Sequence, residues 1–342
     1  MDNNKTDISV TLSRETSLEQ ALKAAGVENP ASVVKLTVAG KVYARDMQYM
    51  RENMGKTLQK LDLGDASFDR NKIYNMRGLS GLTDIIFPDT ISDVYELIFA
   101  LKRLTSITVR AANAVFTSED GVLFNKDKTK LLRYLVARQG QYIIPNSVTT
   151  IGQWAFENCT GLTSIVIPDS VTEIKNGAFV GCSNLKSVII PASAIHIGDG
   201  DTFMSAFCYY VDDSFKCFIT VHPDNPVYAS EDGVVFNKNK TGLLYCSRGK
   251  QGDYTIPDSV VKIKACAFQN CQGLTSIIIP NSVVAIEENV FDGCNHLKSV
   301  FISASVVEIG GTNFYADNIL VTVHPDNPFY TSEDGKLKEK IG

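Results

Sequence analysis

Apolar residues recur at a fixed spacing along most of the chain. A unit of 23 residues with the pattern IPxSVxxIxxxAFxxCxxLxxI runs twice in succession, and a shortened third copy follows. The same group of three returns 112 residues further along, so that the copies start at Ile144, Ile167, Ile190, Ile256, Ile279 and Ile302. Self-similarity at such a period is typical of repeat proteins, in which each unit buries its apolar face only against its neighbours.

A second, longer unit separates the two groups. It starts at Val221 with VHPDNPVYASEDGVVFNKNKTGLLY, and related stretches start at Val109 and, in truncated form, at Val323. Two runs of strand formers, VVF and LLY, are joined by a polar turn, which predicts a β-hairpin. We expect long hairpin units near 109–143 and 221–255, and a truncated one at 323–337. Such hairpins would project from one side of the repeat array or pack over its convex face.

The short units carry the strand signature of a leucine-rich repeat. The stretch from Leu162 to Ile167 follows L-x-x-L-x-L, in which positions one, four and six are expected to face the core. Similar stretches give about twelve parallel rungs, spaced roughly 4.8 Å apart. The pattern predicts one elongated α/β repeat solenoid: a right-handed leucine-rich-repeat superhelix with a parallel β-sheet, inserted β-hairpins and a short α/β N-terminal cap.

Three further columns fill the turns between strands. We expect the phenylalanines to stack as a buried aromatic spine, and the cysteines three residues later to point inward as small hydrophobes. The serines that follow each strand are expected to satisfy backbone groups of the turn. The columns hold Phe156, Phe179, Phe268 and Phe291; Cys159, Cys182, Cys271 and Cys294; and Ser147, Ser170, Ser193, Ser259, Ser282 and Ser305.

Residues 1–57 lack the repeat and predict an α/β capping region ahead of a solenoid over 58–342. The sequence from Ser17 to Gln20 is a capping box, which predicts the start of a helix. The helix is expected to continue to about Ala25 and to end at Gly26. A second helix is expected from Arg45 to Met54. A repeat array must cover the apolar end of its first rung, and a mixed α/β start would do so.

Composition narrows the class of partner. The chain has 342 residues and a formal net charge of −5, which argues against nucleic acid or an anionic membrane as the main partner. Its apolar runs are too short to span a bilayer. Met1–Asp7 does not resemble a signal peptide, so we expect any export signal to lie outside this chain. Eight cysteines are too few for a disulfide-built scaffold, although Cys208 and Cys217 could pair after export or stay small hydrophobes.

The common sequence motifs of catalysis are missing. The chain contains no G-x-x-x-x-G-K-[ST], G-x-S-x-G or H-E-x-x-H, and its four histidines leave few general bases. His222 and His324 both lie in the sequence HPDNP, whose residues are typical of a turn. No strand of the repeat brings several metal-ligating residues together at the spacing that zinc needs. We therefore expect no enzymatic activity, no cofactor and no metal site.

Candidate binding residues point out of the strands. Position five of the strand pattern is often apolar and position three is small and polar, so an apolar stripe would lie beside a hydroxyl stripe on the concave face. A contiguous exposed apolar patch favours a protein- or glycan-binding surface. Alternatively, branched side chains only support neighbouring strands of an exposed sheet. The only tryptophan is expected to be exposed, where it could anchor a partner, stack on a sugar or merely cover local surface. The candidate surface comprises Ile86, Ser106, Trp154, Ser164, Val166, Ser187, Ile189, Ser276, Ile278, Ser299 and Phe301.

The repeat unit resembles the BspA-like leucine-rich repeat, over roughly residues 30–337. The resemblance implies a leucine-rich-repeat solenoid without catalysis, exported to the cell surface or periplasm, often as an outer-membrane lipoprotein. It also implies adhesion to extracellular matrix proteins such as fibronectin. The leading function is therefore a non-enzymatic, adhesin-like cell-surface or secreted protein that binds protein partners such as host extracellular matrix. A surface glycan-binding or nutrient-uptake accessory protein, and a structural spacer, are the alternatives.

Overall fold

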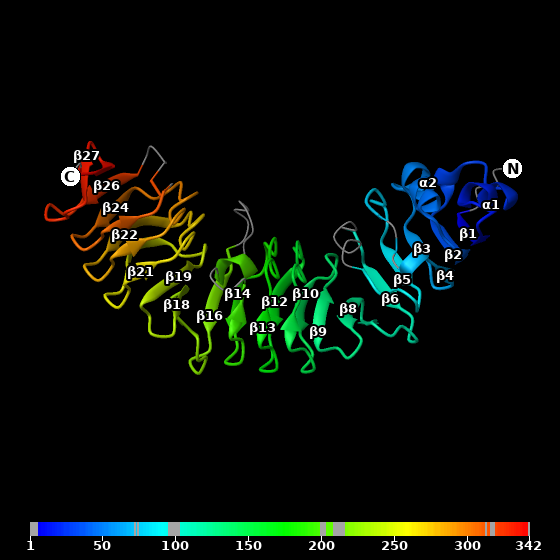
Figure 1. Cartoon of the computed structure of the whole chain (residues 1–342), viewed down its shortest axis with the longest axis horizontal. Coiled ribbons are helices and arrows are strands. Elements are labelled where there is room, and N and C mark those ends of the chain that lie inside the picture. The colour runs from blue at the N-terminus through cyan, green and yellow to red at the C-terminus, as the bar shows by residue number, and fades with distance from the viewer. Residues whose placement is uncertain are drawn as a thin grey trace. The chain divides into compact units, whose positions relative to one another are not determined.

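The computed structural model describes residues 6–71, 73, 75–94, 103–198, 203–207, 216–311, 313–314 and 319–340. They divide into two compact units, unit 1 over residues 1–138 and unit 2 over residues 139–342. Each unit is a stack of short strands, most of which pair parallel with strands that precede and follow them in sequence (Figure 1). The leucine-rich-repeat solenoid with parallel sheets that the apolar columns predict is therefore confirmed.

Unit 1 is built on a parallel sheet whose strands pair in chain order. Alternating burial explains the first strand, because Ile8, Val10 and Leu12 are buried while the residues between them face solvent. The sheet comprises β1 (Asp7–Leu12), β2 (Lys35–Lys41), β3 (Lys60–Asp62), β5 (Asp84–Phe87) and β6 (Ser106–Val109), with β4 (Ala66–Ser67) beside the end of β2. Short 3-10 turns lie at η1 (Pro30–Ser32) and η2 (Asp69–Asn71).

Two helices of unit 1 form where the sequence predicts them. Helix α1 (Leu18–Ala24) begins at the capping box, in which the Ser17 amide donates to Gln20 Oε1 at 2.9 Å. It ends ahead of Gly26, whose φ of +76° needs a residue without a side chain. Helix α2 (Ala44–Met54) starts one residue earlier than expected. The parallel sheet continues across residue 57, and the domain boundary placed there stays a prediction.

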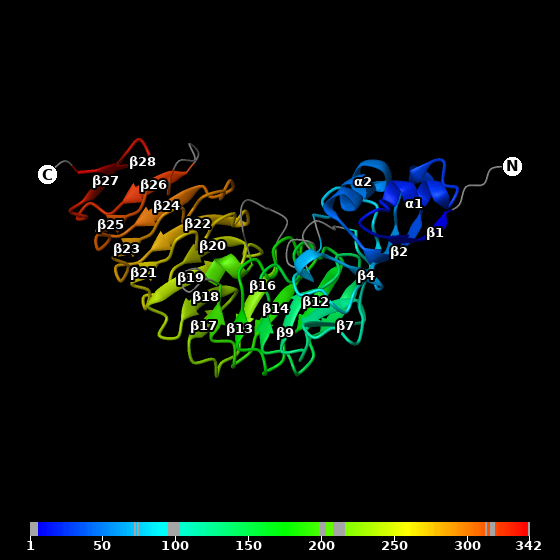
Figure 2. The same ribbon diagram turned by 45° about the vertical axis from the view of Figure 1, so that its right-hand side comes forward.

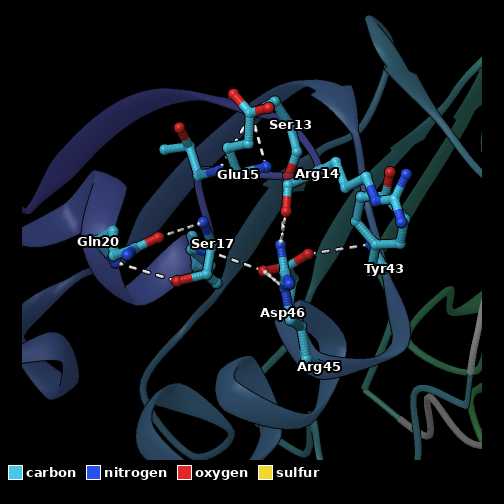
Figure 3. Close-up of polar contacts among 10 residues, drawn as sticks. Ser13, Arg14, Glu15, Ser17, Gln20, Tyr43, Arg45 and Asp46 are labelled. Atoms are coloured by element: carbon cyan, nitrogen blue, oxygen red, sulfur yellow. Dashed lines mark hydrogen bonds and ion pairs between the residues drawn. The ribbon is translucent and has the colours of Figure 1, made fainter.

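Asp46 joins the starts of both helices (Figure 3). Its buried carboxylate accepts hydrogen bonds from the amides of Leu18 at 2.8 Å and Tyr43 at 3.0 Å. Arg45, the neighbouring residue, donates to the carbonyl oxygen of Arg14 at 2.8 Å. The first amides of a helix lack partners within the helix, so one buried side chain stabilises two helix starts at once.

Unit 2 carries a strand on each of two sides of most turns (Figures 1 and 2). The longer strands hold the L-x-x-L-x-L positions, and we call the outward side of these strands in unit 2 the strand face. They are β10 (Gly140–Ile143), β12 (Leu162–Val166), β14 (Ser187–Ile190), β16 (Phe218–Val221), β20 (Gly252–Thr255), β22 (Leu274–Ile279), β24 (Ser299–Ile302) and β26 (Leu320–Val323). The other side of the turns carries two-residue strands in two separate ladders, which we together call the second sheet. The first ladder has β11 (Thr150–Ile151), β13 (Glu173–Ile174) and β15 (His196–Ile197), and the other has β21 (Lys262–Ile263), β23 (Ala285–Ile286) and β25 (Glu308–Ile309).

The predicted aromatic spine is confirmed and is longer than expected. The rings of Phe156 and Phe179 stack with centroids 5.2 Å apart, and Phe207, beside the 3-10 turn η3 (Phe203–Ala206), continues the stack at 5.4 Å. A second stack runs from Phe268 through Phe291 to Phe314. The cysteine column is buried beside these rings as expected. Its thiols also bridge turns, because Sγ of Cys182 and of Cys294 donates at 3.0 Å to a phenylalanine carbonyl of the preceding repeat.

The long units form antiparallel meanders of three strands, one strand more than the hairpin expected. In unit 1 they are β7 (Phe116–Glu119), β8 (Val122–Asn125) and β9 (Lys130–Arg133), and in unit 2 they are β17 (Tyr228–Glu231), β18 (Val234–Asn237) and β19 (Gly242–Cys246). The truncated copy forms β27 (Tyr330–Glu333) and β28 (Lys336–Glu339). The expectation that these units project or cover an outer face is wrong for β17–β19. Val234, Val235 and Phe236 are all fully buried, and β19 pairs parallel with β21 inside the solenoid.

Side chains after the strands tie neighbouring turns together. The hydroxyls of Ser170, Ser193 and Ser305 each donate at 2.7–2.8 Å to a valine carbonyl in the preceding repeat, so they bridge turns instead of closing their own. The column is not uniform, because the hydroxyl of Ser282 is buried without a partner. Cys208 lies outside the described residues, and the pairing with buried Cys217 stays a prediction.

Three buried asparagines fix the meanders to the turns before them. In the HPDNP segment, Asn225 Nδ2 donates to two carbonyl oxygens that follow β14, while Asn225 Oδ1 accepts from the amides of Val227 and Tyr228. The same four-bond pattern recurs at Asn113 in unit 1 and at Asn327 in unit 2. All three side chains are fully buried, so each long unit starts from a rigid anchor.

Candidate functional site

Three exposed apolar side chains lie in one row across the first strands of unit 2. Ile143 of β10 is directly opposite Val166 of β12 in the parallel register, and Ile189 holds the same position on β14. Their exposed fractions are 64%, 43% and 61%. We call Ile143, Val166 and Ile189 cluster 1. The row ends at β16, where Thr220 stands opposite Ile189. Val166 and Ile189 are predicted from the sequence, but Ile143 is not, because only the register shows which residue of β10 points outward.

A second group lies on the later strands of the same face. Ile278 of β22 is 44% exposed and stands opposite Phe301 of β24, which is half-buried. The Phe301 ring meets the His324 ring edge-on, with centroids 6.4 Å apart. We call Ile278 and Phe301 cluster 2. Thr255 and Thr322 flank it on the neighbouring strands, so a threonine bounds the apolar pair on each side.

Position three runs beside these clusters and carries hydroxyl groups, as expected. Ser187 is exposed, whereas the other three predicted serines of unit 2 are half-buried. The column does not stay polar, because an apolar residue replaces serine on the strand that enters each meander. Phe218 is opposite Ser187, and Leu320 is opposite Ser299. Elsewhere in the column, Ser164 stands opposite Gln141, and Ser276 lies in register between Asp253 and Ser299.

Phe218 covers the point where the meander joins the strand face. Its ring lies against Gly233, where an added Cβ would come within 2.8 Å of the ring. Beside it, Lys250 Nζ contacts Asp232 Oδ2 at 2.5 Å and lies 4.7 Å from the centroid of the Tyr254 ring. Burial, with a smaller contribution from nearby acidic groups, raises the pKa of Tyr254 far above its ordinary value. The strand face therefore has a compact polar and aromatic junction between clusters 1 and 2.

Two of the predicted surface residues belong to unit 1. Ile86 lies on β5 and Ser106 on β6, and both are half-buried. These two strands pair in parallel, with Ile86 opposite Thr108. The two residues thus occupy different columns of the sheet of unit 1.

Trp154 lies away from the strand face and is half-buried, unlike the exposed position expected. It sits in the connection between β11 and β12, with a φ of +57°, and its ring covers Gly177 of the next turn. A Cβ on Gly177 would come within 2.1 Å of the Trp154 ring. The ring can pack there because the facing residue has no side chain.

A second apolar row in unit 2 is absent from the sequence prediction. Val261, Val284 and Val307 precede the short strands β21, β23 and β25, and they are 40%, 39% and 47% exposed. The Val284 amide donates to the Val261 carbonyl at 2.9 Å, and the Val307 amide donates to the Val284 carbonyl at 2.9 Å. This row is comparable to cluster 2 in exposure and lies beside the second sheet.

The two HPDNP histidines serve the local turn. Nδ1 of His222 accepts from the Asp224 amide at 3.2 Å, and Nδ1 of His324 accepts from the Asp326 amide at the same distance. Among the described residues, no group of three or more His, Cys, Asp and Glu side chains is placed to hold a metal ion. Within the same residues, no helix has the length and apolar character needed to cross a membrane.

Comparison with known proteins agrees with this architecture. Residues 138–209 and 245–334 match the BspA type leucine rich repeat region in six copies. A leucine-rich repeat protein from Eubacterium ventriosum is 18% identical with a TM-score of 0.50, and the alignment covers 96% of this chain and 87% of that one. A leucine rich cell surface protein from Faecalibacterium prausnitzii is 19% identical (TM-score 0.44, 79% of this chain and 85% of that one). The pneumococcal vaccine antigen PcpA is 15% identical (TM-score 0.49, 95% and 74%). A search of curated proteins finds no significant match.

The stacked parallel strands and inward apolar columns define a leucine-rich-repeat protein, and the similarity to the Eubacterium structure supports the same fold. The repeats in residues 138–209 and 245–334 are similar to the BspA type. Such repeats typically serve as binding scaffolds, and no catalytic family is indicated.

Proposed function

We propose that this chain is a non-enzymatic, cell-surface or secreted binding protein that recognises a protein partner through the strand face. Cluster 1 is the observation that carries the proposal. Single exposed apolar side chains are common, but a run across adjacent strands is typical of an interaction site. The ladder of β10 and β12 holds Ile143 and Val166 in register, and the ladder of β14 and β16 holds Ile189, which lowers the entropy lost when a partner binds.

The chemistry of the strand face suits a protein more than a sugar. Apolar clusters beside a row of serines resemble an interface with an apolar centre and a polar rim. Sugar recognition relies on exposed aromatic rings, whereas Phe301 is half-buried and Phe218 is 39% exposed and packed on a turn. Extracellular matrix protein is the partner class we propose, following the adhesive proteins that this repeat resembles.

A charge-insertion experiment tests the strand face. The double variant Val166→Lys with Ile278→Lys places one ammonium group in each cluster. Val284→Lys is the matched control, because Val284 is 39% exposed, close to the 44% of Ile278, but lies beside the second sheet. Binding is measured by surface plasmon resonance against immobilised matrix proteins, with fibronectin among them, and on a glycan array.

We expect the double variant to lose at least about tenfold in affinity, as for hot-spot residues, while the control binds like the wild type. Thermal stability should change by less than about 0.5 kcal/mol in either variant, because the side chains are exposed. Equal binding by the double variant and the wild type would rule out the strand face. Binding to glycans alone would replace the protein partner with a sugar, and no binding to either panel would favour a spacer.

A further inference from the structure

Two groups of side chains on the strand face repeat each other in composition and in register. In the first group, Lys186 immediately precedes β14, and its carbonyl oxygen accepts a hydrogen bond from the Phe218 amide of β16 at 2.9 Å. Phe218 stands opposite Ser187, and Ile189 lies further along the same strand as Ser187. We call Lys186, Ile189 and Phe218 subsite A. All three side chains are exposed, so one ammonium group accompanies two apolar groups on neighbouring strands.

The same arrangement returns on the later strands of unit 2 (Figure 2). Lys298 immediately precedes β24, and its carbonyl oxygen accepts from the Leu320 amide of β26 at 2.8 Å. Leu320 stands opposite Ser299, and Phe301 occupies the place of Ile189. We call Lys298, Phe301 and Leu320 subsite B. Its lysine and leucine are exposed and its phenylalanine is half-buried, on a strand that pairs with a neighbour at each edge.

The two subsites keep their chemical character although their residues differ. Both contain a lysine, and the other two members change identity between subsites A and B but stay large and apolar. The equivalent positions of β10 and β20 do not keep their character, because Ile143 is replaced by Thr255 and neutral Gln141 by acidic Asp253. The combination of one cation with two large apolar groups therefore favours a single ligand chemistry at both places.

The two lysines of the subsites present charges that no acidic group neutralises. In the described part of the chain, neither Nζ has a hydrogen-bond or ion-pair partner. Lysines elsewhere in unit 2 differ, because Lys240 and Lys262 contact glutamate oxygens at 2.6 Å and 3.0 Å. An ammonium group among apolar side chains is complementary to a carboxylate flanked by apolar groups. Polyanions are bound by runs of basic residues, so a single ammonium group in each subsite favours a peptide.

We propose that subsites A and B each bind a peptide segment in which an acidic residue is next to large apolar residues, and that the partner protein carries at least two such segments. This inference rests on the proposed function and names the chemistry of the partner. The carboxylate pairs with the lysine, while the apolar residues pack against the other two members of the subsite. Four strand intervals separate β14 from β24, which is at least about 19 Å along the strand face. An extended chain crosses that distance with about six residues.

A peptide library tests the ligand chemistry. Phage that display random peptides of about 12 residues, a length that covers one extended recognition segment, are selected on the full chain. The same selection is made on Lys186→Glu with Lys298→Glu, and on Val166→Lys with Ile278→Lys. Val284→Glu is the control, because it adds an acidic side chain at an exposed position beside the second sheet.

We expect the wild type and the control to enrich peptides that combine acidic with large apolar residues. The variant with both lysines replaced should lose these peptides and enrich basic ones, because its subsites then carry carboxylates. The variant with lysines in both clusters should lose the same peptides, because it changes the apolar surroundings of each subsite. Circular dichroism and thermal melting confirm that each variant is folded.

Titration calorimetry with the most enriched peptide, made synthetically, tests the duplication. The wild type should bind two peptides per chain, whereas Lys186→Glu or Lys298→Glu alone should bind one, since the changed subsite weakens at least about tenfold. A second probe joins two copies of the peptide so that equivalent positions are about 15 residues apart, a flexible span of about 21 Å. The joined probe should bind the wild type at least about a hundredfold more tightly than the single peptide, and neither single variant should show this gain.

Some results would overturn this inference and leave the proposed function standing. Peptides without acidic residues, or peptides that still bind after both lysines are replaced, would show that the subsite lysines do not recognise the ligand. One peptide per wild-type chain, or no gain from joining two copies, would show that the subsites are not equivalent. Heparin binding that depends on both lysines, without peptide enrichment, would replace the peptide with a sulphated polysaccharide. No enrichment would also overturn the inference, while the assay with matrix proteins judges the proposed function separately.

Discussion

Removal of the Asn225 side chain should weaken the attachment of the β17–β19 meander to the turn before it. Asn225 Nδ2 donates to the carbonyl oxygens of Pro191 at 3.0 Å and Ala194 at 2.9 Å, and Oδ1 accepts from the amides of Val227 at 3.0 Å and Tyr228 at 2.9 Å. Each such hydrogen bond contributes about 1 kcal/mol net. When the side chain is lost, the backbone groups that it bonded stay buried without a partner, which adds to the loss of stability. We therefore expect Asn225→Ala to cost about 3–4 kcal/mol.

Hydrogen exchange measured by mass spectrometry is the appropriate assay, because a repeat array need not unfold in one step. In Asn225→Ala, the amides of Val227 and Tyr228 should exchange several hundred-fold faster, in line with a loss of about 3–4 kcal/mol. Asn239→Ala is the control, since Asn239 is exposed in the turn between β18 and β19. Its stability should change by less than about 0.5 kcal/mol. Equal protection of the two amides in both variants would refute the anchoring role.

Three further predictions concern single side chains of unit 2. Gly177→Val should cost about 1–3 kcal/mol and shift the fluorescence of Trp154, because the position has a φ of +66° and its Cβ would meet the ring; an unchanged emission spectrum would contradict the contact. Burial raises the pKa of Glu287, but hydrogen bonds led by that from Lys264 outweigh burial and leave it below its ordinary value of 4.5. The resulting stability is present above pH 4.5 and is lost as the pH falls through the lowered pKa, so Glu287→Gln should flatten the dependence of the melting temperature on pH below about pH 5. Burial raises the pKa of Cys294 to about 12, so iodoacetamide at about pH 8 should alkylate it only after denaturation, as peptide mass mapping would show.

The fixed spacing of the short units was enough to predict most of the fold. Each column of Leu, Ile, Phe or Cys repeats one environment, so a single interpretation of Phe156 also explains Phe179, Phe268 and Phe291. The fold class, the stacked rings and the buried thiols follow from that repetition. The capping box at Ser17 is also local, and local signals of this kind are visible in sequence.

The residues that sequence analysis missed depend on contacts between distant positions. Asn225 looks like an ordinary turn residue in HPDNP, but its Nδ2 acceptors lie 31 and 34 residues earlier. Ile143 required the register between β10 and β12, which includes an irregularity after Gly140 that the sequence does not mark. The half-buried position of the Trp154 ring depends on the absence of a side chain at Gly177, one turn further on.

The meanders explain why the exposed apolar side chains of unit 2 come in separate groups. On β18, Val234 and Phe236 pack into the core that follows the meander, whereas Val235 faces Tyr245 and the phenylalanine stack that precedes it. A strand that is buried on both sides has apolar residues at successive positions. For this reason the VVF stretch of β18 lacks the alternation of apolar and polar residues found in the short units. In β28 the same positions read Lys, Leu, Lys, so only the preceding side keeps an apolar residue. The β17–β19 meander thus separates two stretches of short rungs. Each stretch presents its own exposed group, cluster 1 before the meander and cluster 2 after it, and a partner could engage either group without the other.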